Sequence, residues 1–296
     1  MNGRTALPVL RSAPPLTLRQ TGPHTVHLIS TAAGPLGGDH FELDLDVAEG
    51  TTLEVASVAS TLVLPGDGES LMRVTARVAD GATLHFLPEP TVLAAGCTHR
   101  MEVRLALEGT AQVWWREEII FGRYGEAPGT CHTRFDATVD GHPLLSQELT
   151  TGDPRLNTSP AVYNSATCIG TLLLAGPHPG PAKTHSRSAK TDPESTETHS
   201  GPAQPDPGGT HLGSAETNPE ATETHTRPAK PGGTHSGPAG TRPYSAETHP
   251  RVSHVADGVA VLPLAGPGTL VSALARDAVE LRRRLTWGHA ALTSPP

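Results

Sequence analysis

The sequence contains few aromatic residues, few cysteines and no long apolar segment. Aromatic residues make up 3% of the 296 residues, whereas glycine occurs 31 times and proline 29 times, so part of the chain cannot build a core. The three cysteines form no CxxC pair, which favours reduced thiols over a disulfide framework or a zinc ribbon. No apolar stretch is long enough to cross a membrane, and the first residues lack the apolar segment of a secretory signal. We therefore expect a cytoplasmic protein with no membrane partner.

Basic blocks and the common enzyme motifs are also missing. The formal net charge is −8, and the one basic run, Arg282 to Arg284, is placed on a solvated helix face, so no nucleic-acid partner is expected. No GxSxG, GxxxxGK, HExxH or GxGxxG motif occurs in a suitable context. Cys97 and His99 form a nucleophile–base pair on paper, as in a β-rich hydrolase, but no third residue orients the base. We do not expect an enzyme.

The sequence does contain a long series of strand patterns. Residues 40–47 alternate strictly between apolar and polar side chains, which is typical of a half-buried strand. Strand-like runs also occur at 24–30, 52–58, 71–78, 83–87, 100–107, 111–120, 133–139, 169–174 and 259–264. Turns of an acidic residue and a glycine recur between them, with the glycines 31, 28 and 32 residues apart, at Gly50, Gly81, Gly109 and Gly141. This period favours layered, helically wound β-sheets, although an ordinary meander uses the same turns.

The strand patterns stop between residues 177 and 250. This segment repeats variants of THSGPA and SAETH and has too few large apolar residues to form a core, so we predict a long disordered insertion. The Thr-His dipeptides place histidines at His185, His199, His211, His225, His235 and His249. These histidines are 10 to 14 residues apart, so they predict only weak divalent-metal binding and no permanently bound cofactor. Passive drift of a surface loop and a selected metal store both remain as explanations.

Three segments follow from these patterns. Residues 1–176 form a β-rich part, residues 177–250 the insertion, and residues 251–296 a strand and an amphipathic helix that complete the same domain. Thr269 is expected to cap that helix, whose apolar stripe contains Leu270, Leu274, Ala278, Leu281 and Leu285. The expected fold class is all-β with a small C-terminal helical element.

Two adjacent carboxylates, Glu117 and Glu118, lie between apolar residues of the predicted strand 111–120. Neighbouring strand residues point to opposite faces, so at least one of the two faces inward or lines a groove. Such a carboxylate either pairs with a cation, for example Arg116 or Arg123, or has a functional task. The sequence does not decide which of the two glutamates faces inward.

Five short motifs occur in a fixed order along the chain. They are the Gly-Gly-Asp turn Gly37, Gly38 and Asp39; the Leu-Pro-x-Pro corner at 87–90 with Gly96; the group Glu117, Glu118, Gly122, Arg123 and Glu126; the Asp-Gly-x-Pro-Leu-Leu segment at 140–145; and the Gly-Thr-Leu strand at 170–172. No single motif is specific. Together, in this order and spacing, they resemble the urease accessory protein family UreD, also called UreH, over nearly all of the chain outside the insertion.

The resemblance implies a non-catalytic maturation factor with a helically wound β-fold. Members of this family bind apo-urease and join the accessory proteins UreF and UreG, a GTPase, in an assembly that delivers nickel. The resemblance also implies an internal path on which nickel is in transit rather than a cofactor. Candidates for partner binding or for that path are Gly37, Gly38, Asp39, Glu117, Glu118, Gly122, Arg123 and Glu126. The alternative is a stand-alone nickel-buffering protein that acts through the Thr-His tract.

Overall fold

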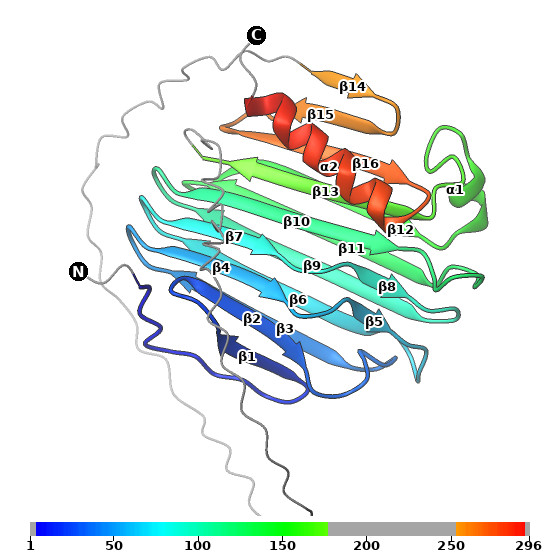
Figure 1. Ribbon diagram of the computed structural model, residues 1–296, viewed down its shortest axis with the longest axis horizontal. Helices are drawn as coiled ribbons and strands as arrows, with labels where there is room; N and C mark the ends of the chain where they lie inside the picture. Colours follow the sequence, from blue (N-terminus) through cyan, green and yellow to red (C-terminus); the bar gives the residue numbers. More distant parts are fainter. Residues whose placement is uncertain (1–3, 177–252, 294–296) are drawn as a thin grey trace, which may run out of the picture. The chain divides into compact units, whose positions relative to one another are not determined.

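Two β-sheets and one long helix make up most of the residues that the computed structural model describes, which are 4–176 and 253–293 (Figure 1). The eleven-stranded sheet contains β1 (Leu16–Gln20), β2 (Thr25–Ser30), β4 (Thr52–Ser57), β5 (Thr61–Val63), β7 (Thr83–Leu87), β8 (Thr91–Leu93), β10 (Gln112–Ile120), β13 (Cys168–Ala175), β14 (His254–Ala256), β15 (Val259–Pro263) and β16 (Gly268–Ala275). The five-stranded sheet contains β3 (His40–Val47), β6 (Ser70–Val78), β9 (Thr98–Leu107), β11 (Thr130–Val139) and β12 (His142–Thr151). The helices are α1 (Pro154–Thr158) and α2 (Ala278–Thr293). The predicted insertion lies outside the described residues.

The chain winds from one sheet to the other and back. β2, β4, β7 and β10 are parallel neighbours in the eleven-stranded sheet, and β3, β6, β9 and β11 are parallel neighbours in the five-stranded sheet. Residues separated by about the spacing of the acidic-glycine turns pair with each other on neighbouring strands. One example is the buried row Leu43, Val74, Val103 and Phe135. The prediction of helically wound β-structure is confirmed, and a meander is excluded for these strands because their neighbours are parallel.

Apolar side chains from both sheets fill the space between them. Val55, Phe86 and Trp115 contribute from the eleven-stranded sheet, and Val74 and Val103 from the five-stranded sheet, to one continuous core. The ring of Trp115 stacks on Phe86 at a centroid distance of 4.1 Å. The alternation seen in the sequence therefore has its expected cause, because one face of each strand is turned toward the opposite sheet.

The acidic-glycine turns join successive turns of the winding. The four glycines have φ between 54° and 76°, a conformation that glycine adopts without strain. The turns are also linked through side chains, because Asp80 Oδ1 accepts hydrogen bonds from Thr110 N at 2.7 Å and from Thr110 Oγ1 at 2.8 Å. These bonds connect turns that are 30 residues apart in the sequence.

The outer face of the five-stranded sheet carries a row of alternating charge. The register aligns Glu42, Arg73, Glu102, Arg134 and Glu148 across all five strands. Arg73 Nη1 lies 2.8 Å from Glu42 Oε1, and Arg73 Nε lies 3.0 Å from Glu102 Oε2. Arg134 Nη1 lies 2.7 Å from Glu148 Oε1. Opposite charges on facing positions stabilise a sheet modestly, whereas like charges there destabilise it.

The Pro-bracketed corner interrupts the eleven-stranded sheet. β10 pairs with β7 through Trp115 and with β8 from Ile119 onward, so residues 116–118 lie opposite the corner between β7 and β8. The prolines of the corner have no N–H to donate to a ladder. The Arg116 guanidinium donates instead to the carbonyl oxygens of Leu87 and Pro88 at 3.1 Å and 2.9 Å. Residues 116–118, which include both predicted glutamates, thus occupy an irregular part of the sheet.

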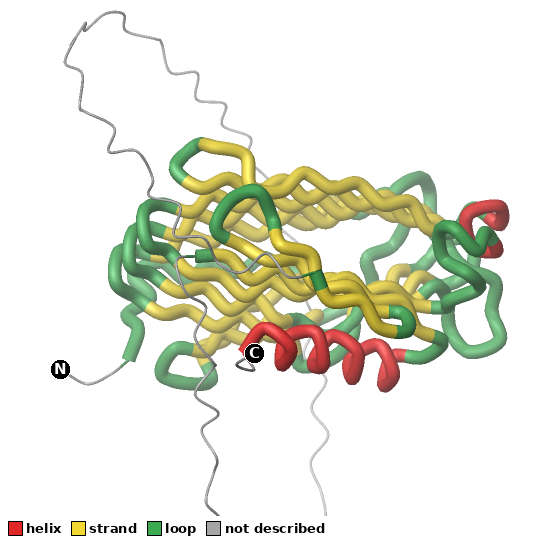
Figure 2. The backbone as a smooth tube through the Cα atoms, turned by 90° about the horizontal axis from the view of Figure 1, so that it is seen from above, coloured by secondary structure: helices red, strands yellow, loops and turns green. Residues whose placement is uncertain are grey.

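The C-terminal part completes the eleven-stranded sheet and then covers it. β13 is antiparallel to both β10 and β16, and all eight of its residues are buried. α2 lies on the outer side of this sheet, away from the five-stranded sheet (Figure 2). Gly170 of β13 leaves room for the helix, since a Cβ atom there would lie 2.9 Å from Leu285 Cδ1. No helix among residues 4–176 and 253–293 is long and apolar enough to cross a membrane.

The predicted position of the C-terminal helix is wrong at its beginning. Thr269 is not a helix cap but part of β16, and the helix begins at Ala278. The sequence of β16 fits a helical stripe as well as a strand, but its backbone pairs with β13 on one side and β15 on the other. This pairing provides hydrogen bonds for both edges of the segment, which overrides local propensity. Leu281 and Leu285 do form the buried side of α2, as expected.

Candidate functional site

Glu117 and Glu118 point to opposite faces of β10. Glu117 is in phase with Val113 and Trp115, whose side chains belong to the core between the sheets. Glu118 is in phase with Trp114, which packs in the cluster beneath α2. The structure thus answers the question that the sequence left open: Glu117 faces the inside of the sandwich, and Glu118 faces the helix.

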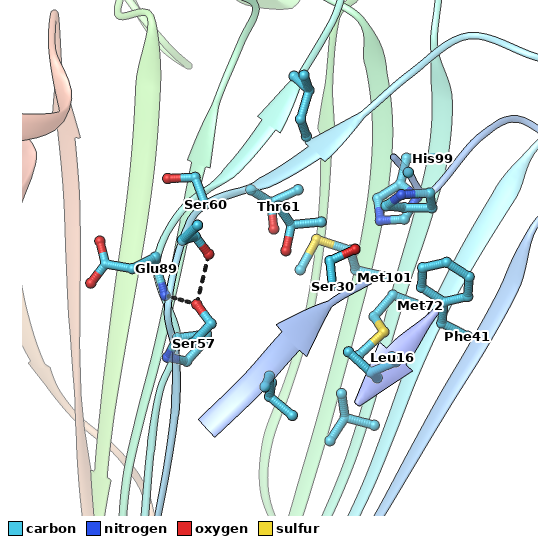
Figure 3. A pocket seen from close by; sticks show the side chains of 18 of the residues that line it. Leu16, Ser30, Phe41, Ser57, Ser60, Thr61, Met72, Glu89, His99 and Met101 are labelled. Carbon is cyan, nitrogen blue, oxygen red and sulfur yellow. Dashed lines mark hydrogen bonds between the residues drawn. The ribbon is translucent and has the colours of Figure 1, made fainter. Parts of the chain in front are cut away.

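A cavity of about 280 Å³ lies between the two sheets, and we call it the inter-sheet cavity. Its lining is largely apolar and includes Phe41, Met72 and Met101, with polar groups from Ser30 and His99 (Figure 3). Glu117 lines the same cavity. Glu89 also borders it, but Figure 3 shows its carboxylate turned away from the labelled methionines and His99. Both sheets therefore contribute to a partly open space that combines apolar walls with a few polar groups.

Glu117 is a partly buried carboxyl group on the wall of this cavity. Burial raises its pKa to about 7, and the Trp115 indole reverses a smaller part of that shift. No ion pair of the described residues includes Glu117; the cations nearest along the strand and on α2 pair with Glu118 and Glu89 instead. At neutral pH the Glu117 carboxyl is thus about half ionised.

His99 lines the same cavity as a neutral imidazole. Its Nδ1 lies 2.8 Å from Ser70 Oγ, and both residues are buried. Burial lowers the pKa of His99 to about 4, and burial raises the pKa of the Cys97 thiol. A nucleophilic cysteine needs the opposite shift, toward a thiolate beside a basic imidazole. The geometry therefore does not support the hydrolase reading of Cys97 and His99.

Glu118 belongs to an ion network of four residues, Glu89, Arg116, Glu118 and Arg282. Arg282 Nε donates to Glu118 Oε1 at 2.9 Å, and its two terminal nitrogens lie 3.3 Å from the carboxylate of Glu89. Arg116 Nε is farther from Glu118 Oε1, at 3.7 Å. The hydrogen bonds to Glu118 raise the pKa of Arg282 above its usual value. The expectation of a cation partner for Glu118 is therefore met mainly by Arg282 and to a lesser extent by Arg116.

The placement of the basic run on a solvated helix face is correct only in part. Arg283 is exposed, whereas Arg282 belongs to the ion network and Arg284 donates to the Leu274 carbonyl oxygen. Leu281 and Leu285 pack against the sheet. Arg282 and Arg284, each next to one of these leucines in the sequence, can therefore reach acceptors on the sheet.

Gly37, Gly38 and Asp39 form a tight turn at which two turns of the winding approach closely. A Cβ atom on Gly37 would lie 2.7 Å from Gly66 C, and one on Gly66 would lie 2.6 Å from Gly37 N. Gly38 has a φ of 92°, and the Asp39 carboxylate accepts a hydrogen bond from Leu36 N at 2.8 Å. These contacts explain, on structural grounds, why glycine, glycine and aspartate occupy these three positions.

The loop after β10 contains Gly122, Arg123 and Glu126. These residues line neither the inter-sheet cavity nor the pocket between Glu118 and α2. Arg123 Nε donates to Glu126 Oε1 at 2.8 Å, and Ala95 N donates to Glu126 Oε2 at 3.3 Å. The Arg123 guanidinium lowers the pKa of Glu126 to about 2. The ion pair lies within the loop, and the hydrogen bond from Ala95 N connects the loop to the turn that contains Gly96. Tyr124, between Arg123 and Glu126, is fully exposed.

The described residues contain no group of three or more His, Cys, Asp or Glu side chains placed to hold a metal ion. The six Thr-His histidines, His185 to His249, lie outside the described residues. All three cysteines, Cys97, Cys131 and Cys168, are buried.

Sequence reasoning missed several polar residues that the fold gathers around β10. Arg282 and His289 come from α2 and His85 from β7, and all three lie beside Glu118. A strand that alternates His85 with Leu84 and Phe86 signals only that His85 faces away from the core. Which helix covers that face depends on long-range pairing, and no local pattern reveals it.

Comparison with known proteins gives one consistent result. The sequence model of the family described as UreD urease accessory protein matches residues 1–295. A urease accessory protein UreD from Frankia casuarinae is 37% identical over 99% of this chain and 86% of its own length. Similar proteins of the same name come from a Parafrankia species, at 34% identity over 96% and 82%, and from Streptomyces coelicolor, at 30% identity over 98% and 91%. This chain therefore belongs to the UreD family of urease accessory proteins.

Proposed function

We propose that this protein, within its family's role in urease maturation, binds apo-urease and recruits UreF and UreG for nickel insertion. The observation that supports it most is the match to the family along residues 1–295. The protein acts as a scaffold and not as an enzyme in this proposal, consistent with family names that describe an accessory protein. Nickel is cargo in this scheme rather than a resident cofactor.

The inter-sheet cavity is the proposed internal part of the nickel path. Moving a dication from water into an apolar space is very unfavourable unless a negative or polar group replaces part of its hydration. Glu117 supplies such a group, because its carboxyl releases a proton near neutral pH. Neutral His99 supplies an imidazole, a good nickel ligand, on the same cavity wall. An isolated carboxylate binds a dication weakly, so the ion can leave again by exchange with a proton.

The loop at residues 122–126 is the proposed docking element for a protein partner. Tyr124 is fully exposed between Arg123 and Glu126, whose ion pair holds the loop in one conformation. Tyrosine and arginine are the residue types that contribute most to binding energy at protein interfaces. A loop ordered in advance also loses less conformational entropy on binding. The Gly-Gly-Asp turn has a supporting structural role and keeps the neighbouring backbone in place.

Co-purification from cells that express the urease subunits, UreF and UreG tests the scaffold. Tagged full-length protein should recover apo-urease and UreF, and failure to recover either one would reject the proposal. Tyr124→Ala should reduce recovery at least tenfold, because truncation of an interface anchor typically weakens binding by more than about 1.4 kcal/mol. Val279→Ala, at another strongly exposed apolar residue, is the matched control and should leave recovery unchanged.

The nickel path has its own test. Glu117→Gln should leave apo-urease recovery intact but lower the nickel content and activity of the urease produced at limiting nickel, whereas Glu42→Gln on the outer face should not. If wild type, Glu117→Gln and Glu42→Gln produced urease of equal nickel content, Glu117 would not be part of the nickel path. Deleting residues 183–249 separates this function from nickel buffering: urease activation should survive the deletion, and loss of activation would favour the Thr-His tract.

A further inference from the structure

The inter-sheet cavity contains two thioether groups. Of the three methionines in the chain, Met1 is the first residue, and the other two, Met72 and Met101, both line this cavity. They are register partners on the neighbouring parallel strands β6 and β9, so their side chains leave the five-stranded sheet side by side on its inner face. The fold therefore places both internal methionines of the sequence on one wall of one cavity.

His99 adds an imidazole to the same wall. It lies two residues before Met101 on β9, so both side chains leave the strand on the same side. Figure 3 shows the side chains of Met72, Met101 and His99 around the same space. Parallel strands are about 4.8 Å apart, and residues two apart on a strand are separated by about 6.6 Å, so the three side chains start from a small triangle. Methionine is long and unbranched and can bring its sulfur to an ion above that triangle.

The His99 ring presents a free nitrogen lone pair. The Ser70 hydroxyl donates to Thr98 O at 3.4 Å, so Ser70 Oγ accepts from His99 Nδ1, which lies 2.8 Å away. With its hydrogen on Nδ1, the neutral ring has its lone pair on Nε2, which takes part in no hydrogen bond between described residues. Burial lowers the pKa of His99 to about 4, so at neutral pH no proton competes for that lone pair. A hydrogen bond that fixes the other ring nitrogen is typical of metal-binding histidines.

The charge on the cavity wall favours a cation. The charged residues that line the cavity are Glu89, Glu102, Glu117 and Glu118. Three of them are paired with arginines, whereas Glu117 belongs to no ion pair of the described residues. The Glu117 carboxyl is about half ionised at neutral pH, and a cation in the cavity would favour its charged form. The uncompensated charge is thus at most one negative charge, which matches a singly charged cation.

The ligand types favour a soft metal ion of low charge. Two thioethers and one imidazole form a soft ligand set, and Cu(I) is the ion that thioether ligands select, whereas magnesium and calcium require oxygen ligands. A singly charged ion also costs less to remove from water than a dication, because the solvation energy of an ion rises with the square of its charge. The apolar remainder of this wall, which includes Phe41, offers no competing side-chain oxygen.

We propose that Met72, Met101 and His99 form a three-coordinate site for cuprous ion in the inter-sheet cavity. The two sulfur atoms and His99 Nε2 are the ligands, and Glu117, which lines the same cavity, supplies the compensating charge. Because two of its ligands are thioethers, the site differs from groups of His, Cys, Asp and Glu, of which the described residues contain none with three members. The site does not depend on the proposed nickel path; if nickel does pass through this cavity, a cuprous ion bound there would obstruct it.

A titration of the full-length protein, labelled with ¹³C at the methionine methyl groups, tests the site. Three methionines give three methyl signals, and Met72→Leu and Met101→Leu each identify one of them by its loss. Cuprous ion is added without oxygen, with its free concentration set by the chelator bicinchoninate, and without nickel or urease. The Met72 and Met101 signals should shift together and saturate at one equivalent, whereas the Met1 signal should not shift. Zinc at the same concentration should leave all three signals in place, because it does not require thioether ligands.

Conservative variants identify the ligands. Leucine replaces methionine with little change in volume, so Met72→Leu should fold normally, and the remaining Met101 signal still reports binding. Half-saturation of that signal should need at least about tenfold more free cuprous ion than in wild type, because one ligand is lost. His99→Asn should weaken binding to a similar extent. His132→Asn, on the outer face of the same sheet, is the matched control and should leave binding unchanged.

Three outcomes would overturn the site. Binding of cuprous ion without a shift of the Met72 and Met101 signals would place the ion on cysteine thiols or on the Thr-His histidines, and the two methionines would then only fill space in the core. Equal half-saturation in wild type and Met72→Leu would show that the thioethers are not ligands. A zinc-induced shift as large as that caused by cuprous ion would show that sulfur does not select the metal. Should His99→Asn unfold the protein, the two methionine variants decide.

Discussion

Replacing Glu117 by glutamine should stabilise the protein at alkaline pH and change its stability little at acidic pH. Glu117 lies on an apolar cavity wall without an ion-pair partner among the described residues, and burial raises its pKa to about 7. The unfolded chain exposes the same carboxyl to water, where its pKa has the ordinary value of 4.5. Glutamine has nearly the same shape and hydrogen-bonding capacity but no ionisation.

The sign follows from proton binding. Between pH 4.5 and pH 7 the folded protein keeps a proton on Glu117 that the unfolded chain releases, so the free energy of unfolding falls as pH rises and levels off above the folded pKa. The slope approaches about 1.4 kcal/mol per pH unit, which gives a total loss of about 3 kcal/mol. Glu117 is only partly buried, so contact with solvent reduces this figure, and the expected loss from this residue is about 2 to 3 kcal/mol.

Denaturant unfolding of wild type, Glu117→Gln and Glu42→Gln at pH 5, 6, 7 and 8 measures the effect. The stability difference between Glu117→Gln and wild type should grow by about 1 to 2 kcal/mol from pH 5 to pH 8, because part of the loss has already occurred at pH 5. Glu42 is exposed and paired with Arg73 on the outer face, so its variant should follow the wild-type pH dependence within about 0.5 kcal/mol. Parallel curves for Glu117→Gln and wild type would refute the assignment of Glu117 as a carboxyl with a raised pKa.

Three further predictions concern the structural roles of named residues. Gly66→Ala should destabilise the protein by more than about 2 kcal/mol in thermal unfolding because its Cβ would meet the Gly37 backbone, whereas Gly125→Ala, with open space around it, should lose only about 1 kcal/mol for its positive φ. Arg282→Ala should lower the free energy of unfolding by about 3 kcal/mol, since it leaves Glu118 buried without its main partner, while Arg283→Ala should be neutral; equal effects would contradict the ion network. Burial raises the pKa of Cys168 to about 11, so at pH 8 the native thiol should react with a maleimide at least tenfold more slowly than in the unfolded chain, and equal rates would contradict the burial.

The periodic part of the fold was predictable because its cause is local. All ten predicted strand segments exist, and residues 40–47 and 83–87 match β3 and β7 at both ends. Alternation identifies such strands because one face packs on the opposite sheet, and the glycine spacing gives the register because each turn of the winding repeats the last. The short strands β5 and β8 follow tight corners and have too few residues to show any period.

Other features depended on contacts between distant segments. β16 was predicted as helix because its apolar residues fit a helical stripe, and only the pairing with β13 and β15 decides its conformation. The sequence showed that Glu117 and Glu118 face opposite ways but not which way each faces. That assignment required knowing which face of β10 is turned toward the five-stranded sheet. The position of α2 then determined that Arg282, 164 residues away, would neutralise Glu118.

The charge row on the outer face of the five-stranded sheet limits how the winding can change in length. Its signs alternate from Glu42 through Arg73, Glu102 and Arg134 to Glu148. Removing one turn, for example the turn that contains β9, would place Arg73 directly opposite Arg134, whereas removing the turns of both β6 and β9 would place Glu42 opposite Arg134. Like charges on facing strand positions destabilise a sheet. On this face, turns of the winding can therefore be lost or duplicated in pairs without placing like charges opposite each other. Losing or duplicating a single turn would place like charges on facing positions.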